Sequence, residues 1–191
     1  MPSFESMLVK CLNGFYDKEK IAAMAYKLPM VRYRQQGFDV YSDSRHYSYY
    51  AAFECKSVEA ENEEPLYFSR YFHHVKGVHQ LEHENNIVDR SGRAAFLAVE
   101  LKRRRGLRKS AFLVPWRVVM RHYSKGDVGI EALEITNCVE LDYSHGGYHV
   151  TEEVKEAYLL QVCGKPKSKK KEVTEVRDWH SRKIAKAGGS V

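Results

Sequence analysis

The sequence lacks the features that define several classes of protein. No apolar run approaches the roughly 20 residues of a membrane-spanning helix, and the first residues, MPSFESMLVK, show no signal-peptide pattern. The four cysteines include no closely spaced pair that would indicate a zinc or redox motif. HQLEH at 79–83 is not the HExxH of metalloproteases, so we expect no zinc. We therefore expect a soluble, cytoplasmic protein without a membrane partner, whose cysteines are reduced and mostly buried.

The bulk composition is that of a folded, basic domain. The 191 residues are 43% hydrophobic and 29% charged, close to the averages of globular proteins, and include 13 tyrosines. This length is enough for one well-filled core and a tail. The formal net charge of +6 favours a polyanionic partner, but by itself it indicates non-specific attraction and no chemistry.

Local patterns predict alternating helical and extended stretches. Ser3 is in position to cap the first helix, Pro29 to end the second, and Gly92 to end the third. The expected elements are helices at 4–16, 18–28, 78–90 and after Pro115, a β-hairpin at 38–58, and two apolar strands in RAAFLAVELK and SAFLVPW.

The chain changes character after Gly164. KPKSKKKEVTEVRDWHSRKIAKAGGSV is polar and rich in lysine, which is typical of a flexible basic tail. We therefore expect one domain over residues 1–163 and a C-terminal tail over 164–191. Residues 126–163 contain short strand-like pieces, such as AYLLQVC. The sequence does not indicate how these pieces are arranged relative to one another.

Two charged residues interrupt the apolar strand expected around AAFECKSV. Residues two apart on a strand share a face, so Glu54 and Lys56 project together. Unpaired buried charges cost several kcal/mol, so on an interior strand these residues form an ion pair, a metal site or both. Asp39 on the preceding strand can add a second carboxylate, and such oxygens suit Mg²⁺ or Mn²⁺. This set favours phosphodiester hydrolysis, although a solvent-facing ion pair is the commoner origin of Glu-x-Lys.

Five motifs follow one another along the chain: QQGFDV, AAFECKS, VHQLEHENN, RAAFLAVELK and SAFLVPW. Their order resembles that of the PD-(D/E)xK nuclease superfamily, and within it the Holliday junction resolvases of the RecU type and their archaeal Hjc-like relatives. The resemblance covers residues 4 to 120 or so, and the stretch from Asp127 onward matches nothing in that family. It implies an α/β, restriction-endonuclease-like fold, with a central mixed β-sheet flanked by helices.

The resemblance also implies roles for individual residues. Asp39 and Glu54 would be metal ligands for Mg²⁺ or Mn²⁺, and Lys56 would assist the attacking water. Gln80 and Glu5 would complete the catalytic set.

Three of these assignments have alternatives. Asp43 also lies upstream of Glu54, but we prefer Asp39 because it lies inside the apolar strand pattern, whereas Asp43 lies in the turn. Glu5 equally suits the positive N-terminus of the first helix. Gln80 without the resemblance would be a helix-surface glutamine.

Basic residues flank the predicted site in the sequence, and a solvated hairpin tip and loop are their alternative interpretation. The candidates for contacts with DNA phosphates are Arg32, Arg34, Arg103, Arg104, Arg105 and Lys109.

We therefore expect a metal-dependent endonuclease that resolves four-way DNA junctions by paired, symmetric nicks. Two symmetric nicks require two sites, which favours a two-fold homodimer. The alternatives are a restriction-like or repair nuclease that cuts duplex or flap DNA, and a DNA-binding protein without catalysis on the same scaffold.

Overall fold

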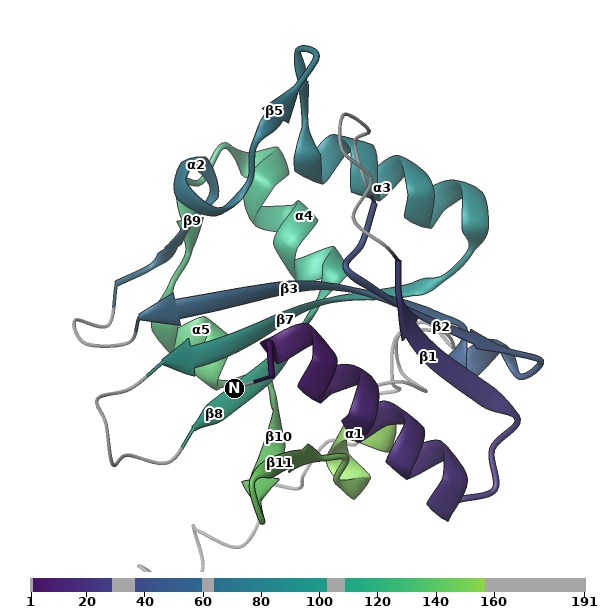
Figure 1. Ribbon diagram of the computed structural model, residues 1–191. Coiled ribbons are helices and arrows are strands. Elements are labelled where there is room, and N and C mark those ends of the chain that lie inside the picture. The colour runs from purple at the N-terminus through teal and green to yellow at the C-terminus, as the bar shows by residue number, and fades with distance from the viewer. Residues whose placement is uncertain (1, 29–36, 60–63, 103–108, 157–191) are drawn as a thin grey trace, which may run out of the picture.

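A seven-stranded sheet forms the centre of the molecule (Figure 1). The computed structural model describes residues 2–28, 37–59, 64–102 and 109–156. Among the described strands of this sheet, the central pair β3 and β7 is parallel and every other neighbouring pair is antiparallel. In their order across the sheet, the strands are β1 (Ala23–Lys27), β2 (Val40–Ser44), β3 (Ala51–Glu59), β7 (Ala94–Lys102), β8 (Ser110–Pro115), β10 (Val139–Ser144) and β11 (Gly147–His149).

Helices cover both faces of the sheet. The helix α1 (Phe4–Lys18) lies on one face, whereas α3 (Gln80–Ser91) and α4 (Trp116–Lys125) lie on the other (Figure 1). Each face has its own core, because alternate residues of β3 point to opposite sides. The predicted class, an α/β fold with a central mixed sheet flanked by helices, is confirmed. The shorter elements are η1 (Tyr47–Tyr49), β4 (Leu66–Tyr67), α2 (Phe68–Tyr71), β5 (His74–Val75), β6 (Val78–His79), β9 (Gly129–Ile130) and α5 (Ala132–Thr136).

The first predicted helix is confirmed and the second is wrong. Ser3 caps α1, and its Oγ accepts a hydrogen bond from the Ser6 backbone N–H at 3.4 Å. Residues 23–27, expected to be helical, form β1, which pairs with β2. The side-chain amide of Asn13 in α1 donates to the Ala25 carbonyl at 2.9 Å and accepts from the Ala25 N–H at 2.8 Å. These long-range bonds outweigh the helix propensity of KEKIAAMAYKL.

The remaining predicted elements agree with the structure, apart from their ends. Strands β2 and β3 form the expected hairpin, but residues 47–49 belong to η1 and not to β3. Helix α3 starts at Gln80, two residues later than expected, and ends at Ser91. Its C-cap is Gly92, whose φ of 68° few other residues adopt readily. Strands β7 and β8 and helix α4 are confirmed.

The predicted domain boundary stays a prediction. Val154 is still fully buried in the core beneath α1, so the described chain is part of one packed unit up to that point. AYLLQVC and the lysine-rich tail lie outside the described residues.

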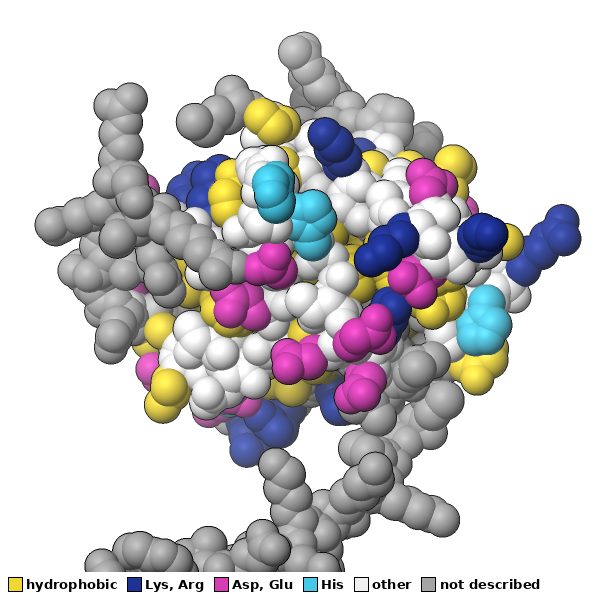
Figure 2. All heavy atoms as spheres, turned by 90° about the horizontal axis from the view of Figure 1, so that it is seen from below, with side chains coloured by type: hydrophobic (Ala, Val, Ile, Leu, Met, Phe, Trp, Pro, Cys, Tyr) yellow, Lys and Arg dark blue, Asp and Glu magenta, His cyan; other side chains and the backbone are white. Residues whose placement is uncertain are grey.

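The described surface mixes charges of both signs. On the face seen from below, acidic side chains lie among lysines, arginines and histidines (Figure 2). Helices within the described part of the chain are too short or too polar to cross a membrane. Cys11 and Cys55 are free and buried, as expected, and burial raises the pKa of the Cys11 thiol to about 12.

Candidate active site

The charged pair of β3 lies inside the molecule. The side chains of Glu54 and Lys56 are only 2% and 16% exposed, and Lys56 Nζ lies 2.6 Å from Glu54 Oε1. The same ammonium lies 4.8 Å from the centre of the Phe72 ring. Burial by itself lowers the pKa of Lys56, but the charge of Glu54 and its hydrogen bond outweigh burial and raise that pKa. Lys56 is therefore held as a cation.

Asp39 lies next to this pair. It immediately precedes β2, and its Oδ2 accepts a hydrogen bond from the backbone N–H of Cys55 at 2.8 Å. Burial raises the pKa of Asp39, although the Cys55 N–H and the charge of Lys56 oppose that rise. Burial also raises the pKa of Glu54, and the negative charge of Asp39 adds to that rise despite the opposing charge of Lys56. The structure therefore brings Asp39, Glu54 and Lys56 together.

Glu5 lies beside a lysine that the sequence analysis missed. Lys27 Nζ, at the end of β1, is 3.6 Å from Glu5 Oε2 and donates to Ser3 Oγ at 3.3 Å. The charge of Glu5 contributes to raising the pKa of Asp39, so Glu5 lies within electrostatic range of that carboxyl group. However, no three His, Cys, Asp or Glu side chains of the described residues lie close enough to share one metal ion. The role of Glu5 stays a prediction.

Gln80 is held by hydrogen bonds at both ends of its amide. Its Nε2 donates to Glu54 Oε1 at 2.8 Å and to Glu84 Oε1 at 2.7 Å. Its Oε1 accepts from the His73 backbone N–H at 3.4 Å. Both N–H groups are therefore used inside the protein, so Gln80 orients carboxylates in this structure and has no N–H left for a phosphate.

Glu84 is a second functional candidate that the sequence analysis missed. It is 0% exposed, and it lies one helical turn after Gln80 on the face of α3 that packs on the sheet. The signal was present in the sequence, because Leu81, Glu84 and Val88 have the spacing of an apolar helix stripe. A glutamate in such a stripe indicates a buried carboxyl group with a specific partner, as Glu54 does in its apolar strand.

The carboxylates present fit a hard divalent cation. Glu54 Oε2 and Glu84 Oε2 are buried without a hydrogen-bond partner, which is costly for a carboxylate oxygen. Mg²⁺ is commonly held by one or two carboxylates, with water in its other positions. Asp39 and Glu54 would therefore hold Mg²⁺ or Mn²⁺ without a third protein ligand.

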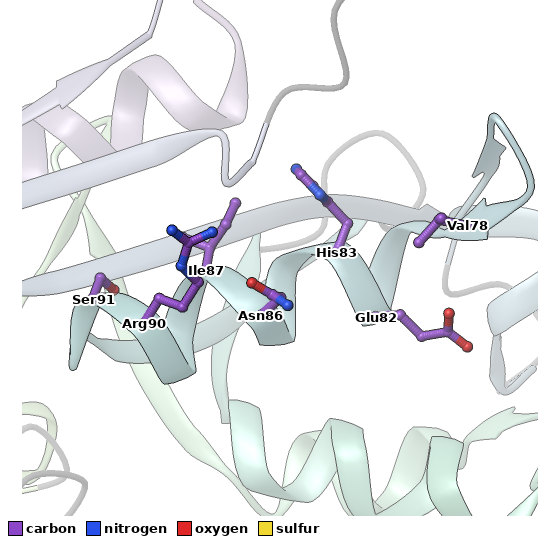
Figure 3. A pocket seen from close by; sticks show the side chains of 7 residues that line it. All are labelled: Val78, Glu82, His83, Asn86, Ile87, Arg90 and Ser91. Carbon is purple, nitrogen blue, oxygen red and sulfur yellow. The ribbon is translucent and has the colours of Figure 1, made fainter.

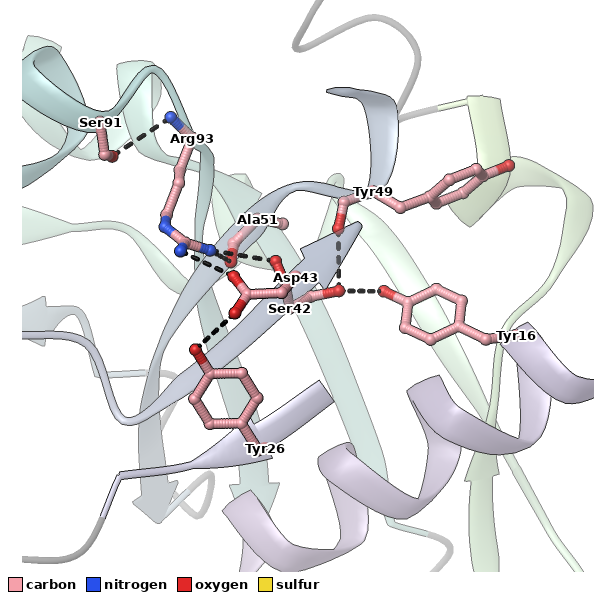
Figure 4. Close-up of polar contacts among 8 residues, drawn as sticks. All are labelled: Tyr16, Tyr26, Ser42, Asp43, Tyr49, Ala51, Ser91 and Arg93. Carbon is pink, nitrogen blue, oxygen red and sulfur yellow. Dashed lines mark hydrogen bonds and ion pairs between the residues drawn. The ribbon is translucent and has the colours of Figure 1, made fainter. Parts of the chain in front are cut away.

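The rival aspartate is engaged elsewhere. Asp43 Oδ1 pairs with Arg93 at 2.7 Å, and its Oδ2 accepts from Tyr26 at 2.8 Å (Figure 4). Arg93 also donates to the carbonyls of Ser42 and Ala51. The Asp43 side chain is 49% exposed, and its hydrogen bonds outweigh partial burial and lower its pKa. The expectation that Asp43 lies in the turn is wrong, because it belongs to β2 and pairs with Met24 of β1. Through Arg93, which precedes β7, Asp43 ties β2 to the start of that strand.

The two histidines of HQLEH do not converge. The His79 ring caps α3 by accepting from the Leu81 N–H at 3.2 Å, and it stacks on Tyr123. His83 instead lines a groove along the outer face of α3 with Asn86 and Ile87 (Figure 3). None of the predicted catalytic residues lines that groove.

Of the predicted DNA contacts, Lys109 lies within the described residues. Its Nζ is 3.8 Å from Glu100 Oε1, and its side chain is 36% exposed, so part of its charge is already balanced. Its role in binding DNA stays a prediction. The others, Arg32, Arg34, Arg103, Arg104 and Arg105, lie outside the described residues.

The burial of Glu84 predicts a specific dependence of stability on pH. Burial, followed by the charge of Glu54, raises the pKa of Glu84 well above 4.5. A carboxyl with a higher pKa in the folded state contributes stability that is present below its unfolded pKa and is lost as the pH rises through its folded pKa. We expect the wild-type Tm to fall through that range, and the Tm of Glu84→Gln to fall less. Thermal unfolding across pH measures both, and equal slopes would contradict the burial of an ionisable Glu84.

The comparisons with known proteins give a structural likeness. No family model matches the sequence, and no curated protein matches it. Among solved structures, the chain is similar to Hjc of Archaeoglobus fulgidus, a Holliday junction resolvase from an archaeal hyperthermophile. The two are 13% identical, the match covers 78% of this chain and 91% of the other, and the TM-score is 0.35. At this level a likeness carries no functional argument, so a function has to rest on the geometry of the site.

Proposed function

We propose that the protein is a metal-dependent endonuclease that hydrolyses phosphodiester bonds in DNA. The observation that carries this proposal is the meeting of Asp39, Glu54 and Lys56 in one buried cluster. Phosphodiester hydrolysis needs a bound divalent ion and a positive charge near the phosphate that reacts. Two carboxylates and one lysine whose pKa is raised supply the groups for both.

Each side chain then has a defined task. Asp39 and Glu54 bind the ion, and Gln80 keeps the Glu54 carboxylate in one orientation. When bound, Mg²⁺ supplies Lewis acidity to the phosphate and makes water more acidic. Lys56 cannot act as a base while its pKa is raised, so it donates hydrogen bonds to the attacking water or to the phosphate. The Phe72 ring limits the access of solvent to that ammonium.

The four-way junction is our proposed substrate. It rests on the order of the motifs, from QQGFDV to SAFLVPW, that resembles the junction resolvases. A junction needs two symmetric nicks, so we propose a homodimer with one site in each subunit. The arginines of RRRGLRK would add electrostatic attraction to the phosphate backbone.

Cleavage assays on three substrates test this proposal. The purified protein is incubated with four-way junction, linear duplex and flap DNA, with and without Mg²⁺. We expect paired symmetric nicks in the junction only, dependent on Mg²⁺. Cuts in duplex or flap DNA would favour a restriction-like or repair nuclease, and binding without cleavage would favour a non-catalytic DNA-binding protein. Light scattering on the same sample measures whether it is a dimer.

A further inference from the structure

A buried glutamate of α3 contacts both Gln80 and the predicted metal ligand Glu54. Glu84 has 0% of its surface exposed, and its Oε1 accepts an N–H from Gln80 at 2.7 Å. The other N–H of the same amide nitrogen goes to Glu54 at 2.8 Å. One planar group therefore joins a helix carboxylate to the strand carboxylate that we assign to the metal.

This link fixes the direction of the Gln80 amide. Two N–H groups on one nitrogen point about 120° apart in the amide plane, so their two acceptors define that plane. The His73 backbone N–H holds the amide oxygen at 3.4 Å. Without an acceptor at Glu84, one N–H would be buried and unpaired, and the amide could turn away from Glu54 to find a partner.

Stability alone gives no reason for a carboxylate at this position. Glu84 lies in the apolar stripe of α3, among residues such as Leu81 that pack on the sheet. Replacing a buried hydrogen-bonded pair with apolar groups of the same shape can be nearly neutral or stabilising. The carboxylate is therefore better explained by what it does to Gln80 and, through Gln80, to Glu54.

We propose that Glu84 is a positioning residue for the metal site, which orients Glu54 by fixing the amide of Gln80. This inference rests on the proposed function, because it takes Glu54 as a metal ligand. Groups that orient metal ligands typically contribute about 10- to 100-fold to metal affinity or activity.

Binding of Mn²⁺, measured by calorimetry on the full chain without DNA, tests the inference. Glu84→Leu removes the acceptor, and we expect its Kd for Mn²⁺ to rise by about 10- to 100-fold. Its Tm without metal should be lower than that of the wild type, because one Gln80 N–H is then buried without an acceptor. Glu84→Gln keeps an oxygen that accepts from Gln80, so its Kd should stay within about threefold of the wild type. A merely structural role would change the Tm and leave the Kd unchanged.

Glu100→Gln is the matched control. Glu100 is also a buried glutamate, 5% exposed, but it lies on β7 and accepts from Ser57 at 3.0 Å and from Tyr148 at 3.0 Å. We expect its affinity for Mn²⁺ to equal that of the wild type. A weakening in Glu100→Gln as large as in Glu84→Leu would overturn the inference, because any buried carboxylate would then have the same effect.

Failure of the inference can be told from failure of the proposed function. If wild type and Glu54→Gln bind Mn²⁺ equally or not at all, the proposed function fails. If only Glu54→Gln loses Mn²⁺ and Glu84→Leu binds like the wild type, the positioning role of Glu84 is overturned. Should Glu84→Leu not fold, Glu84→Met removes the same carboxylate with a smaller change in shape. Weaker binding of Mn²⁺ by Glu84→Met then supports the inference, and unchanged binding overturns it.

Discussion

Glu54→Gln is expected to remove Mg²⁺-dependent cleavage of a four-way junction, with a rate loss on the order of 10³-fold or more. Glutamine has nearly the shape of glutamate but no negative charge, so it cannot attract a divalent ion. The buried Lys56 ammonium, 2.6 Å away, would also lose its partner. Single-turnover cleavage measures the rate, and circular dichroism verifies that the variant is folded.

Asp43→Asn is the matched control for this loss. Asp43 is the rival carboxylate of the same hairpin, but it pairs with Arg93 and is 49% exposed. Its removal breaks an exposed ion pair, which typically contributes less than about 1 kcal/mol to stability. We expect Asp43→Asn to cleave at the wild-type rate. A result in which Asp43→Asn loses activity and Glu54→Gln keeps it would reverse our assignment of the two carboxylates.

Lys56→Ala is expected to separate binding from catalysis. The loss of a positive charge beside the reacting phosphate typically lowers the rate by about 10²- to 10³-fold. Affinity for the junction should change little, because DNA affinity comes from many phosphate contacts. The variant should also be less stable by about 3–5 kcal/mol, because the 2%-exposed Glu54 loses its ion-pair partner. Cleavage, electrophoretic mobility shift and denaturant unfolding measure the three effects.

Two further variants control for the effects of Lys56→Ala. Lys56→Met keeps most of the aliphatic stem of Lys56 but removes the ammonium that lies over Phe72, so it separates packing from charge. Lys10→Ala removes one positive charge from an exposed site on α1. We expect Lys56→Met to be inactive and Lys10→Ala to be active. Wild-type cleavage by Lys56→Met would exclude the ammonium from the mechanism.

Short-range patterns were enough to predict most of the elements. The end of α3 followed from Gly92, and β3 and β7 followed from apolar runs of β-branched and aromatic residues. The prediction of a helix over residues 23–27 was wrong because their conformation depends on Asn13 and on β2. Both are too distant in the sequence for a local pattern to include them. That error also hid Lys27, whose contact with Glu5 depends on the same strand.

The sequence predicted the site residues whose charges interrupt the apolar strand β3. It missed Glu84, whose carboxyl group interrupts the apolar stripe of helix α3. The alternation of β3 led directly to Glu54 and Lys56, which lie 2.6 Å apart. Glu84 has a partner that is distant in sequence, and Gln80 joins it to Glu54 only after α3 packs on β3. The sequence pattern favoured Asp39 over Asp43, and the hydrogen bond to Cys55 is the contact that brings Asp39 next to Glu54.

A crystal grown with Mn²⁺ is the most direct test of the central claim, that Asp39 and Glu54 hold one divalent ion beside Lys56. We predict an anomalous peak with oxygen atoms of both carboxylates about 2.1 Å away, and with water in its remaining positions. A structure with Mn²⁺ bound at other residues, or with no peak at this position at saturating Mn²⁺, would contradict the claim.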